Sequence, residues 1–434
     1  MRDPVGYVSF EGDKVIRHVY QEYLGEIEFL NSNLAKELVN TGKLIPYEFH
    51  ETKPHEIHAK RISFQSLPID WCASQLRAAA ELTLEISKFI NKNNYELKDA
   101  SAWNIIFIGC EPIFCDHLSF RKIKENKWWA FGQFIRNFVF PLIIKKYKRI
   151  DVGGLFRIFK DGPSVNFTKE ILGLRIYTTR YWLLIIQTNA NKPKKNNINN
   201  IKFSIHHNLY EYLKFLLTGL EDQKQLQTWT NYTKERCHYP EEAINQKKKI
   251  VSEWLSEINP ERVIDLGCNT GEFSNMALSI NAEVVAVDGS EACIEKLFTQ
   301  NRGNKKLYPV HTNLGDVCGG GGWSGEEYKS LIHRLDNWGD VVLMLALIHH
   351  LAITESISYK AIADMATKIC KKYLIIEYIS ESDEMFKSLC LARNRPLEDF
   401  CLQKQIDAFS DVFELIREFE LSGGMRKIVL LKKK

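Results

Sequence analysis

The sequence lacks a large net charge, although about a quarter of its 434 residues are charged. Its 58 lysines and arginines nearly balance its 54 aspartates and glutamates, which leaves a formal charge of +4. A protein that binds nucleic acid mainly through phosphates usually carries a clear positive excess. The balance therefore argues against a nucleic-acid partner, while it leaves room for a local basic patch.

Signals for export, membrane insertion and cysteine cross-linking are also missing. Residues 1–10 contain no apolar signal core, and no apolar run reaches the roughly eighteen residues of a membrane span. The ten cysteines form no C-x-x-C pair and no Cys/His cluster at zinc spacing. We expect a cytoplasmic protein without a membrane span, a disulfide framework or a metal centre.

The length of the chain exceeds one ordinary hydrophobic core and predicts two domains. We expect an N-terminal α+β domain over residues 1–225 and an α/β domain over residues 226–434. The Asn/Lys-rich stretch at 189–200 is too polar to pack and is expected to form a loop. Residues 127–147 predict two helical pieces divided at Pro141, and residues 413–419 predict a final helix before a last strand at 426–431.

Residues 263–274, V-I-D-L-G-C-N-T-G-E-F-S, predict a turn that binds a cofactor. An aliphatic run indicates a buried strand ending near Asp265, and Gly267 and Gly271 indicate a tight turn that opens a helix. Glycine lets the backbone approach a ligand, and the first turn of a helix offers free N–H groups. About twenty residues further on, a second strand ends in Asp288, where an acid can accept hydrogen bonds from a ribose diol.

The residue types in this turn indicate which of two kinds of cofactor it binds. Turns that bind NAD usually carry G-x-G-x-x-G, whereas this one keeps an acid before its first glycine, where the acid can face a cationic amino acid moiety. The stretch resembles motif I of the class I S-adenosylmethionine-dependent methyltransferases, with Asp288 as the acid of motif II. The resemblance implies S-adenosylmethionine as cofactor and a Rossmann-like domain with a seven-stranded, mostly parallel sheet. The candidate cofactor-binding residues are Tyr232, Lys247, Asp265, Gly267, Asn269, Gly271, Phe273, Asp288, Gly289, Asn313, Leu314 and Leu345.

Candidate catalytic residues follow the next two predicted strands. His349 and His350 come after the strand at 340–345, and Glu377 ends the strand at 373–376. The carboxyl ends of parallel strands face the ligand crevice, so these side chains are expected near the transferable methyl group. Histidine titrates near neutrality and suits proton removal from a hydroxyl. The alternative is that these residues only shape the pocket.

The N-terminal domain contains a second informative stretch. Asp99, Asn104 and Asp116 surround a predicted hairpin, and this order resembles the catalytic segment of protein-kinase-like and aminoglycoside-phosphotransferase-like enzymes. The resemblance implies that Asp99 orients the hydroxyl of the acceptor. It also implies that Asn104 and Asp116 hold Mg²⁺ on the phosphates of the nucleotide. Leu97 replaces the usual His, and Asp116-His117-Leu118 replaces Asp-Phe-Gly. Three interpretations stay open: turn caps, a degenerate kinase-like shell, or an active phosphotransferase.

Several segments in fixed order extend the resemblance over most of the chain. They are L-K-D-A-S-A-W-N, F-C-D-H-L-S-F, D-L-G-C-N-T-G-E-F-S, L-A-L-I-H-H-L-A-I and I-I-E-Y. Together they resemble a bacterial family of two-part methyltransferases that includes a host-specific nodulation protein. The first hypothesis is O-methylation of a sugar, a glycan or another small polar acceptor. The alternatives are a bifunctional kinase-methyltransferase of polysaccharide type and an RNA or protein methyltransferase.

Overall fold

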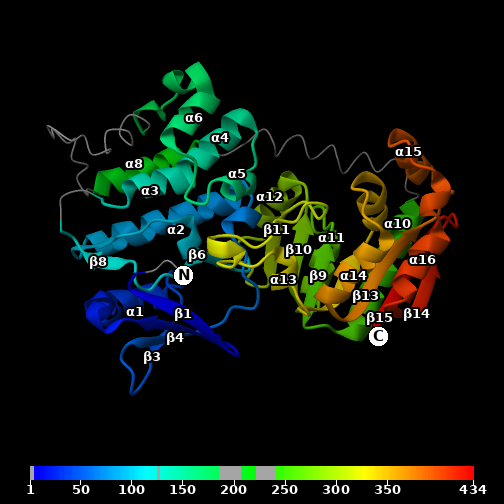
Figure 1. Ribbon diagram of the computed structural model, residues 1–434, viewed down its shortest axis with the longest axis horizontal. Coiled ribbons are helices and arrows are strands. Elements are labelled where there is room, and N and C mark those ends of the chain that lie inside the picture. The colour runs from blue at the N-terminus through cyan, green and yellow to red at the C-terminus, as the bar shows by residue number, and fades with distance from the viewer. Residues whose placement is uncertain (1–3, 125–127, 185–206, 221–240) are drawn as a thin grey trace. The chain divides into compact units, whose positions relative to one another are not determined.

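The computed structural model describes residues 4–124, 128–184, 207–220 and 241–434. The chain forms two compact units, Met1–Asp222 and Gln223–Lys434. Figure 1 labels the helices and strands of both units. The candidate Tyr232 and the stretch at 189–200 lie outside the described residues. Within the described ranges, no helix combines the length and the apolar character that a bilayer crossing requires.

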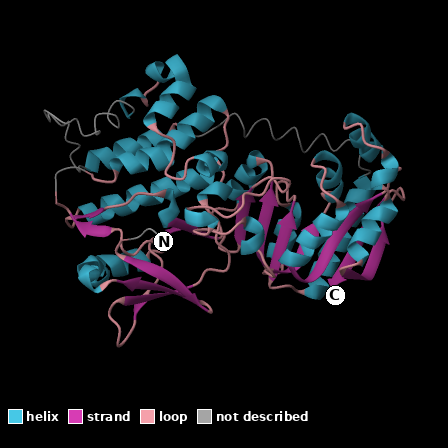
Figure 2. Ribbon diagram, in the orientation of Figure 1, coloured by secondary structure: helices cyan, strands magenta, loops and turns pink. Residues whose placement is uncertain are grey.

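A seven-stranded sheet forms the centre of the C-terminal unit (Figure 2). Its order is β11-β10-β9-β12-β13-β15-β14, and only the pairings of β15 are antiparallel. The strands span Arg262–Leu266 (β9), Glu283–Asp288 (β10), Leu307–His311 (β11), Gly339–Met344 (β12), Cys370–Ile379 (β13), Phe413–Glu420 (β14) and Arg426–Lys433 (β15). The central strands read as nearly continuous apolar runs because both of their faces are buried. The expected mixed α/β sheet is therefore confirmed.

Successive strands are added first on one side of the central strand β9 and then on its other side, and this change of direction creates a crevice. It passes through α11 (Glu272–Ser279) and α12 (Glu291–Gln300) to β10 and β11, and then crosses to β12, α14 (Tyr359–Ile369) and β13. Right-handed crossovers in opposite directions place their helices on opposite faces of the sheet. On one face α10 (Glu241–Ile258) packs on α11, and on the other α14 packs on α13 (Leu331–Arg334) and α16 (Leu402–Ser410). The order reverses between β9 and β12, where open α/β sheets bind ligands.

The last segment of the chain corrects one prediction. Residues 413–419, expected as a helix, form the edge strand β14, which pairs with β15. A register shift between Leu415 and Arg417 interrupts the alternation of the strand. The apolar residues Phe413, Ile416 and Phe419 consequently fall three apart, which imitates helical spacing. Glu414, Arg417, Glu418 and Glu420 place charges on this edge strand, where Leu415 and Ile416 are also exposed.

In the residues of the N-terminal unit that the structure describes, the strands form three small antiparallel sheets. The first has the order β1-β2-β4-β3, from Gly6–Glu11, Lys14–Val19, Glu56–Lys60 and Glu48–Phe49, and begins with the β1–β2 hairpin. The others pair β5 (Tyr95–Leu97) with β8 (Phe120–Lys122), and β6 (Ile105–Ile108) with β7 (Glu111–Phe114). The sequence predicted the β6–β7 hairpin, and this hairpin positions Asn104 and Asp116 at its open end.

Helices form the rest of the N-terminal unit, around α2 (Ala73–Asn91). The buried alanines 78–80 of α2 allow close approach, and α2 contacts α4 (Phe140–Lys148), α8 (His207–Thr218) and β7. Among the described residues of this unit, the other α-helices are α1 (Asn33–Asn40), α3 (Phe131–Phe134), α5 (Val152–Ile158) and α6 (Val165–Leu172). A 3₁₀ segment, η5 (Gly173–Thr178), follows α6.

The two helical pieces expected around Pro141 form one run instead. A π-helical turn, Ile135–Val139, joins α3 directly to α4, which has Pro141 in its first turn. Proline has no N–H for the preceding turn, and a wider π turn accommodates the missing bond without ending the helix. Buried Asn137 in this turn donates to the Gln133 and Asp161 carbonyls, at 3.1 and 3.2 Å.

Candidate cofactor site

A cavity of about 340 Å³ opens in the C-terminal unit where β9 and β12 end. Six of the predicted cofactor residues line it: Lys247, Asp265, Gly267, Asn269, Phe273 and Leu345. Its wall also contains residues that the sequence did not single out, namely Ile244, Cys268, Thr270, Glu272, Ala346, Met385 and Arg426. The cavity lies at the reversal of strand order, so the sheet topology alone accounts for its position.

The turn after β9 depends on its two glycines. Gly267 and Gly271 have φ values of +74° and +83°, which side chains disfavour. A Cβ on Gly271 would lie 2.3 Å from Leu297 Cδ1 on α12, so this glycine lets α12 pack against the turn. The N–H groups of Gly267 and Cys268 both donate to the Val287 carbonyl, at 2.8 and 3.0 Å. The turn is thereby fixed to the end of β10 and presents its backbone to the cavity.

Asp265 is the buried acid of the cavity. Its side chain is nearly inaccessible, and Ser274 Oγ donates to its Oδ2 at 2.6 Å. Burial raises the pKa of Asp265 to about 6, against the lowering effect of the Ser274 hydroxyl. A buried carboxylate of this kind gains most from a cationic ligand, because the cation offsets the cost of removing the charge from water.

Asp288, the predicted partner acid, ends β10 but is not part of the cavity lining. Its Oδ2 accepts from the Asn269 N–H at 2.8 Å, and its Oδ1 accepts from the Ser290 N–H at 2.7 Å. Burial raises the pKa of this carboxyl despite both bonds. In the structure Asp288 fixes the turn after β9, and the remaining lone pairs of its oxygens can still accept.

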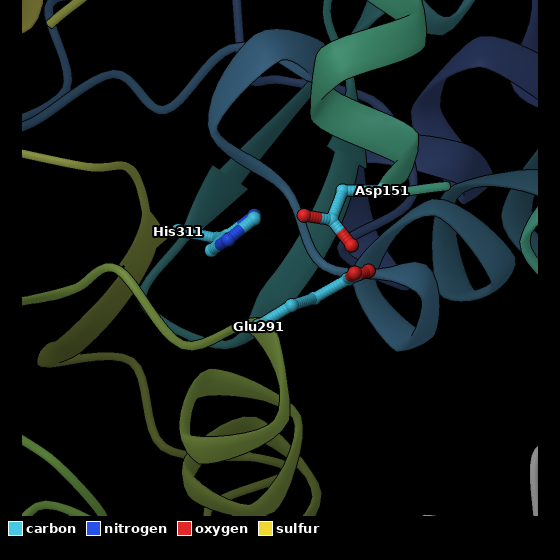
Figure 3. A group of neighbouring side chains, drawn as sticks. All are labelled: Asp151, Glu291 and His311. Carbon is cyan, nitrogen blue, oxygen red and sulfur yellow. The ribbon is translucent and has the colours of Figure 1, made fainter. Parts of the chain in front are cut away.

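The other predicted cofactor residues lie around this strand end. Gly271, Gly289, Asn313 and Leu314 are outside the cavity lining. Asn313 is exposed, and its Oδ1 accepts from the Gly315 N–H at 2.9 Å. Figure 3 labels Glu291, which begins α12, and His311, which ends β11. His311 Nε2 lies 3.2 Å from the Gly289 carbonyl, so the imidazole is tied to the loop after β10.

An ion-pair network, defined here as Lys247, Glu377, Asp383 and Arg426, forms part of the cavity wall and its support. The fully buried Glu377 accepts from Lys247 Nζ at 2.5 Å and from Arg426 Nη1 at 3.2 Å. Arg426 Nε also donates to Asp383 Oδ2 at 2.8 Å, and Asp383 Oδ1 caps α15 (Glu384–Ala392). Strand register opposes Arg426 to Ile379, two residues beyond Glu377. The antiparallel register of β13 and β15 places Arg426 at the cavity. The sequence alone did not reveal this register, so Arg426 was not among the predicted site residues.

The two histidines after β12 have different environments. His349 is buried, and burial and then His350 lower its pKa well below the usual value. His350 is exposed, although burial and Arg426 also lower its pKa. Within the described part of the chain, His349 Nδ1 has no hydrogen-bond partner. Neither histidine belongs to the cavity lining, but Arg426 and Lys247, which do, act electrostatically on His349.

In the N-terminal unit the three predicted phosphate-site residues lie near one another. The Cys115 N–H donates to the Asn104 carbonyl at 2.8 Å, which sets Asp116 beside Asn104 at the open end of the β6–β7 hairpin. Ser119 Oγ lies 3.4 Å from both the Asn104 amide and the Asp99 carbonyl oxygen. Asp116 pairs with Arg17 of β2 at 3.3 Å, and its Oδ1 accepts from the Leu118 N–H at 3.2 Å.

The network gives the first testable prediction. Glu377→Gln leaves Lys247 and Arg426 close together without their shared counter-charge, so it should lower the free energy of unfolding by about 3–5 kcal/mol. The matched control is Glu257→Gln, which breaks the exposed pair with Arg417 at 2.6 Å and should cost less than about 1 kcal/mol. Urea unfolding measures both, and equal effects would contradict the role given to Glu377.

Comparisons with known proteins found one relative that matches nearly the whole chain and solved structures that match part of it. No family model matches the chain. Nodulation protein NoeA of Rhizobium meliloti (strain 1021) is 24% identical over 455 aligned residues, which cover 98% of this chain and 94% of the relative. Two solved structures are similar to part of the chain. Magnesium protoporphyrin IX methyltransferase of Synechocystis PCC 6803 with bound SAM has a TM-score of 0.32 at 15% identity, and covers 44% of this chain and 80% of its own.

The second solved structure is N-methyltransferase NodS from Bradyrhizobium japonicum WM9 in complex with S-adenosyl-L-homocysteine. It has a TM-score of 0.33 at 9% identity and covers 46% of this chain and 95% of its own. Both solved proteins are methyltransferases, one with SAM and the other with SAH bound. The sheet of the C-terminal unit is mixed, with a reversal of strand order beside β9 and with β15 antiparallel to β13.

Proposed function

We propose that this protein transfers the methyl group of S-adenosylmethionine to a hydroxyl of a sugar or another small polar acceptor. The observation that carries the proposal is the cavity at the strand reversal, which combines a buried acid, Asp265, with a glycine turn. The resemblance of the turn to motif I and the full-length similarity to NoeA support it.

The residues of the cavity fit this donor. When bound, S-adenosylmethionine supplies an electrophilic methyl group on a positively charged sulfur. Asp265 offers a negative charge to the cationic end of the molecule, and the backbone at Gly267 offers close approach. Lys247 is held by Glu377 in the cavity wall, where its ammonium group can meet the methionine carboxylate. Phe273 and Leu345 supply apolar surface, and Lys247 Nζ lies 5.2 Å from the centre of the Phe273 ring.

His349 is the proposed proton acceptor. Burial keeps its imidazole neutral at physiological pH, and its Nδ1 has no partner within the described residues. A donor held by Asp265 and Lys247 would supply its methyl group to the acceptor oxygen, and its sulfur would keep the electron pair of the C–S bond. His349 takes the hydroxyl proton as the new C–O bond forms. Glu377 is a weaker candidate for this role because Lys247 and Arg426 bind both of its oxygens, so we assign it as a positioning residue.

The charges in the wall favour an uncharged polar acceptor. In the network, Lys247 and Arg426 are matched by Glu377 and Asp383. A balanced network offers neither a cationic nor an anionic acceptor a large electrostatic gain. Hydroxyl groups, in contrast, can hydrogen-bond to either kind of group at little desolvation cost. This balance is the reason for placing sugars ahead of nucleic acids and proteins as acceptors.

A second candidate function is phosphoryl transfer by the N-terminal unit. The observation that favours it is the grouping of Asp99, Asn104 and Asp116 around Ser119 at the open end of the hairpin. Carboxylate and amide oxygens are the ligands that Mg²⁺ prefers, and Arg17 beside Asp116 could contact a phosphate. This chemistry would make the protein a bifunctional kinase-methyltransferase.

Mass spectrometry of acceptor pools incubated with donor and enzyme tests the proton acceptor. His349→Gln should slow formation of a product heavier by the mass of one methylene by about 10²–10⁴-fold, because the hydroxyl proton loses its acceptor. Donor affinity should stay within a few-fold of wild type. His350→Gln is the matched control and should keep nearly full rate. A full rate in His349→Gln, with the product still formed, would exclude His349 as the base.

The same assay, run with Mg²⁺ and ATP, tests whether the N-terminal unit also transfers a phosphoryl group. An active N-terminal site would add the mass of a phosphoryl group, and Asp99→Asn should abolish that product while leaving methylation intact. Absence of any phosphorylated product in wild type would restrict the protein to methyl transfer.

The pKa of Asp265 predicts a pH dependence of donor binding. Burial raises this pKa to about 6, so the carboxylate is ionised above pH 6 and protonated below it. Only the ionised form attracts a cation, and a bound cation favours ionisation. Donor affinity, measured by calorimetry, should therefore be constant above pH 7 and fall towards tenfold per unit below about pH 6. Asp265→Asn should bind more weakly with no such fall; an identical pH profile in this variant would contradict the assignment.

A further inference from the structure

The N-terminal unit contains a second cavity, of about 440 Å³, with an unusual lining. Its wall consists of Lys146 and Tyr147 of α4, Arg175, Thr178, Thr179, Arg180 and Tyr181 in and after η5, and Gly219 after α8. Three of these side chains are cations, and the lining contains no aspartate or glutamate. In the described ranges of the chain, none of the three cations pairs with a carboxylate. The cavity therefore presents an excess of positive charge.

Two of the cations are held in place. The Arg180 guanidinium lies 4.7 Å from the Phe215 ring centre and 5.4 Å from that of Tyr181, and its Nε donates to Tyr181 Oη at 3.3 Å. Tyr181 Oη in turn donates to the Leu216 carbonyl at 3.3 Å. Lys146 Nζ donates to the Gly219 carbonyl. Stacking on two rings orders a guanidinium before any ligand arrives, which lowers the entropy lost on binding.

Gly219 is where the two held cations converge. A Cβ at this position would lie 1.0 Å from Arg180 Nη2, so any larger residue would displace the guanidinium. Glycine is therefore required for the guanidinium to lie against the backbone that also binds Lys146. Burial, and then the charge of Arg180, lower the pKa of Lys146. Like charges held together in a partly buried place are costly, and a bound anion removes that cost.

We propose that this cavity binds a phosphate group, either free phosphate or the phosphate of a small organic ester. A guanidinium and an ammonium group side by side can share the oxygens of one phosphate, with Arg180 acting through its fork of N–H groups. The Thr178 and Thr179 hydroxyls donate to the Arg175 and Ile176 carbonyls, both at 2.9 Å, and their lone pairs are not suited to an anion. Arg175 completes the positive rim. The volume exceeds that of a phosphate ion and leaves room for a small attached group.

Calorimetric titration of the full chain tests the site, with inorganic phosphate and glucose 1-phosphate as probes. EDTA is present throughout, so that Mg²⁺ cannot recruit Asp99, Asn104 and Asp116. Wild type should show saturable binding that weakens as salt is raised. Comparable affinity for both probes identifies free phosphate as sufficient, whereas at least tenfold tighter binding of glucose 1-phosphate identifies an ester site.

Three variants separate geometry from charge. Gly219→Ala keeps every charge but displaces the Arg180 guanidinium, so it should weaken phosphate binding at least tenfold. Arg180→Gln should weaken binding to the same extent, and it replaces Gly219→Ala in the test if that variant does not fold. Lys148→Gln is the matched control, because it removes an exposed charge from the same helix two residues beyond Lys146, and it should bind as wild type does. No saturable binding by wild type, or an equal loss in Lys148→Gln, would overturn the proposal.

Discussion

A single buried carboxylate, Glu377, determines how the wall of the cofactor cavity is built. It lies at the end of β13 and binds Lys247 from α10 and Arg426 from β15, so elements far apart in the sequence meet at one charge. Burying a charge is costly unless it is paired, and the pairing is satisfied only when both cations lie close to Glu377. Arg426 extends the constraint to Asp383 at the start of α15, which carries Met385 to the cavity. The position of the wall follows from this requirement.

The opposite side of the cavity depends on the backbone rather than on charge. The glycine turn after β9 is fixed by Asp288 and by the Val287 carbonyl, and Ala346 after β12 also adopts a positive φ, of +55°. A non-glycine residue in that region is strained, and such strain is often found where a backbone borders a ligand. Asp265 lies between the two strand ends as the acid of the cavity. The site thus combines backbone of the turn after β9 and of Ala346 with the balanced charges of the ion-pair network.

Local sequence predicted the parts of the site that lie within one motif. Asp265 lies in β9, and Gly267, Asn269 and Phe273 follow that strand directly, so their spacing was enough to place them on one cavity. Arg426 could not be predicted in this way, because its position depends on the antiparallel register of β15. The edge strand β14 was mistaken for a helix because its bulge places apolar residues three apart. Where pairing between distant strands sets the geometry, local periodicity carries too little information.

The central claim is that the cavity beside Asp265 holds the methyl donor. A crystal structure of the protein with S-adenosylhomocysteine tests it most directly. We expect the amino acid part of the ligand between Asp265 and Lys247, with the turn at Gly267 against it. A structure in which the ligand binds elsewhere and this cavity stays closed or empty would contradict the account.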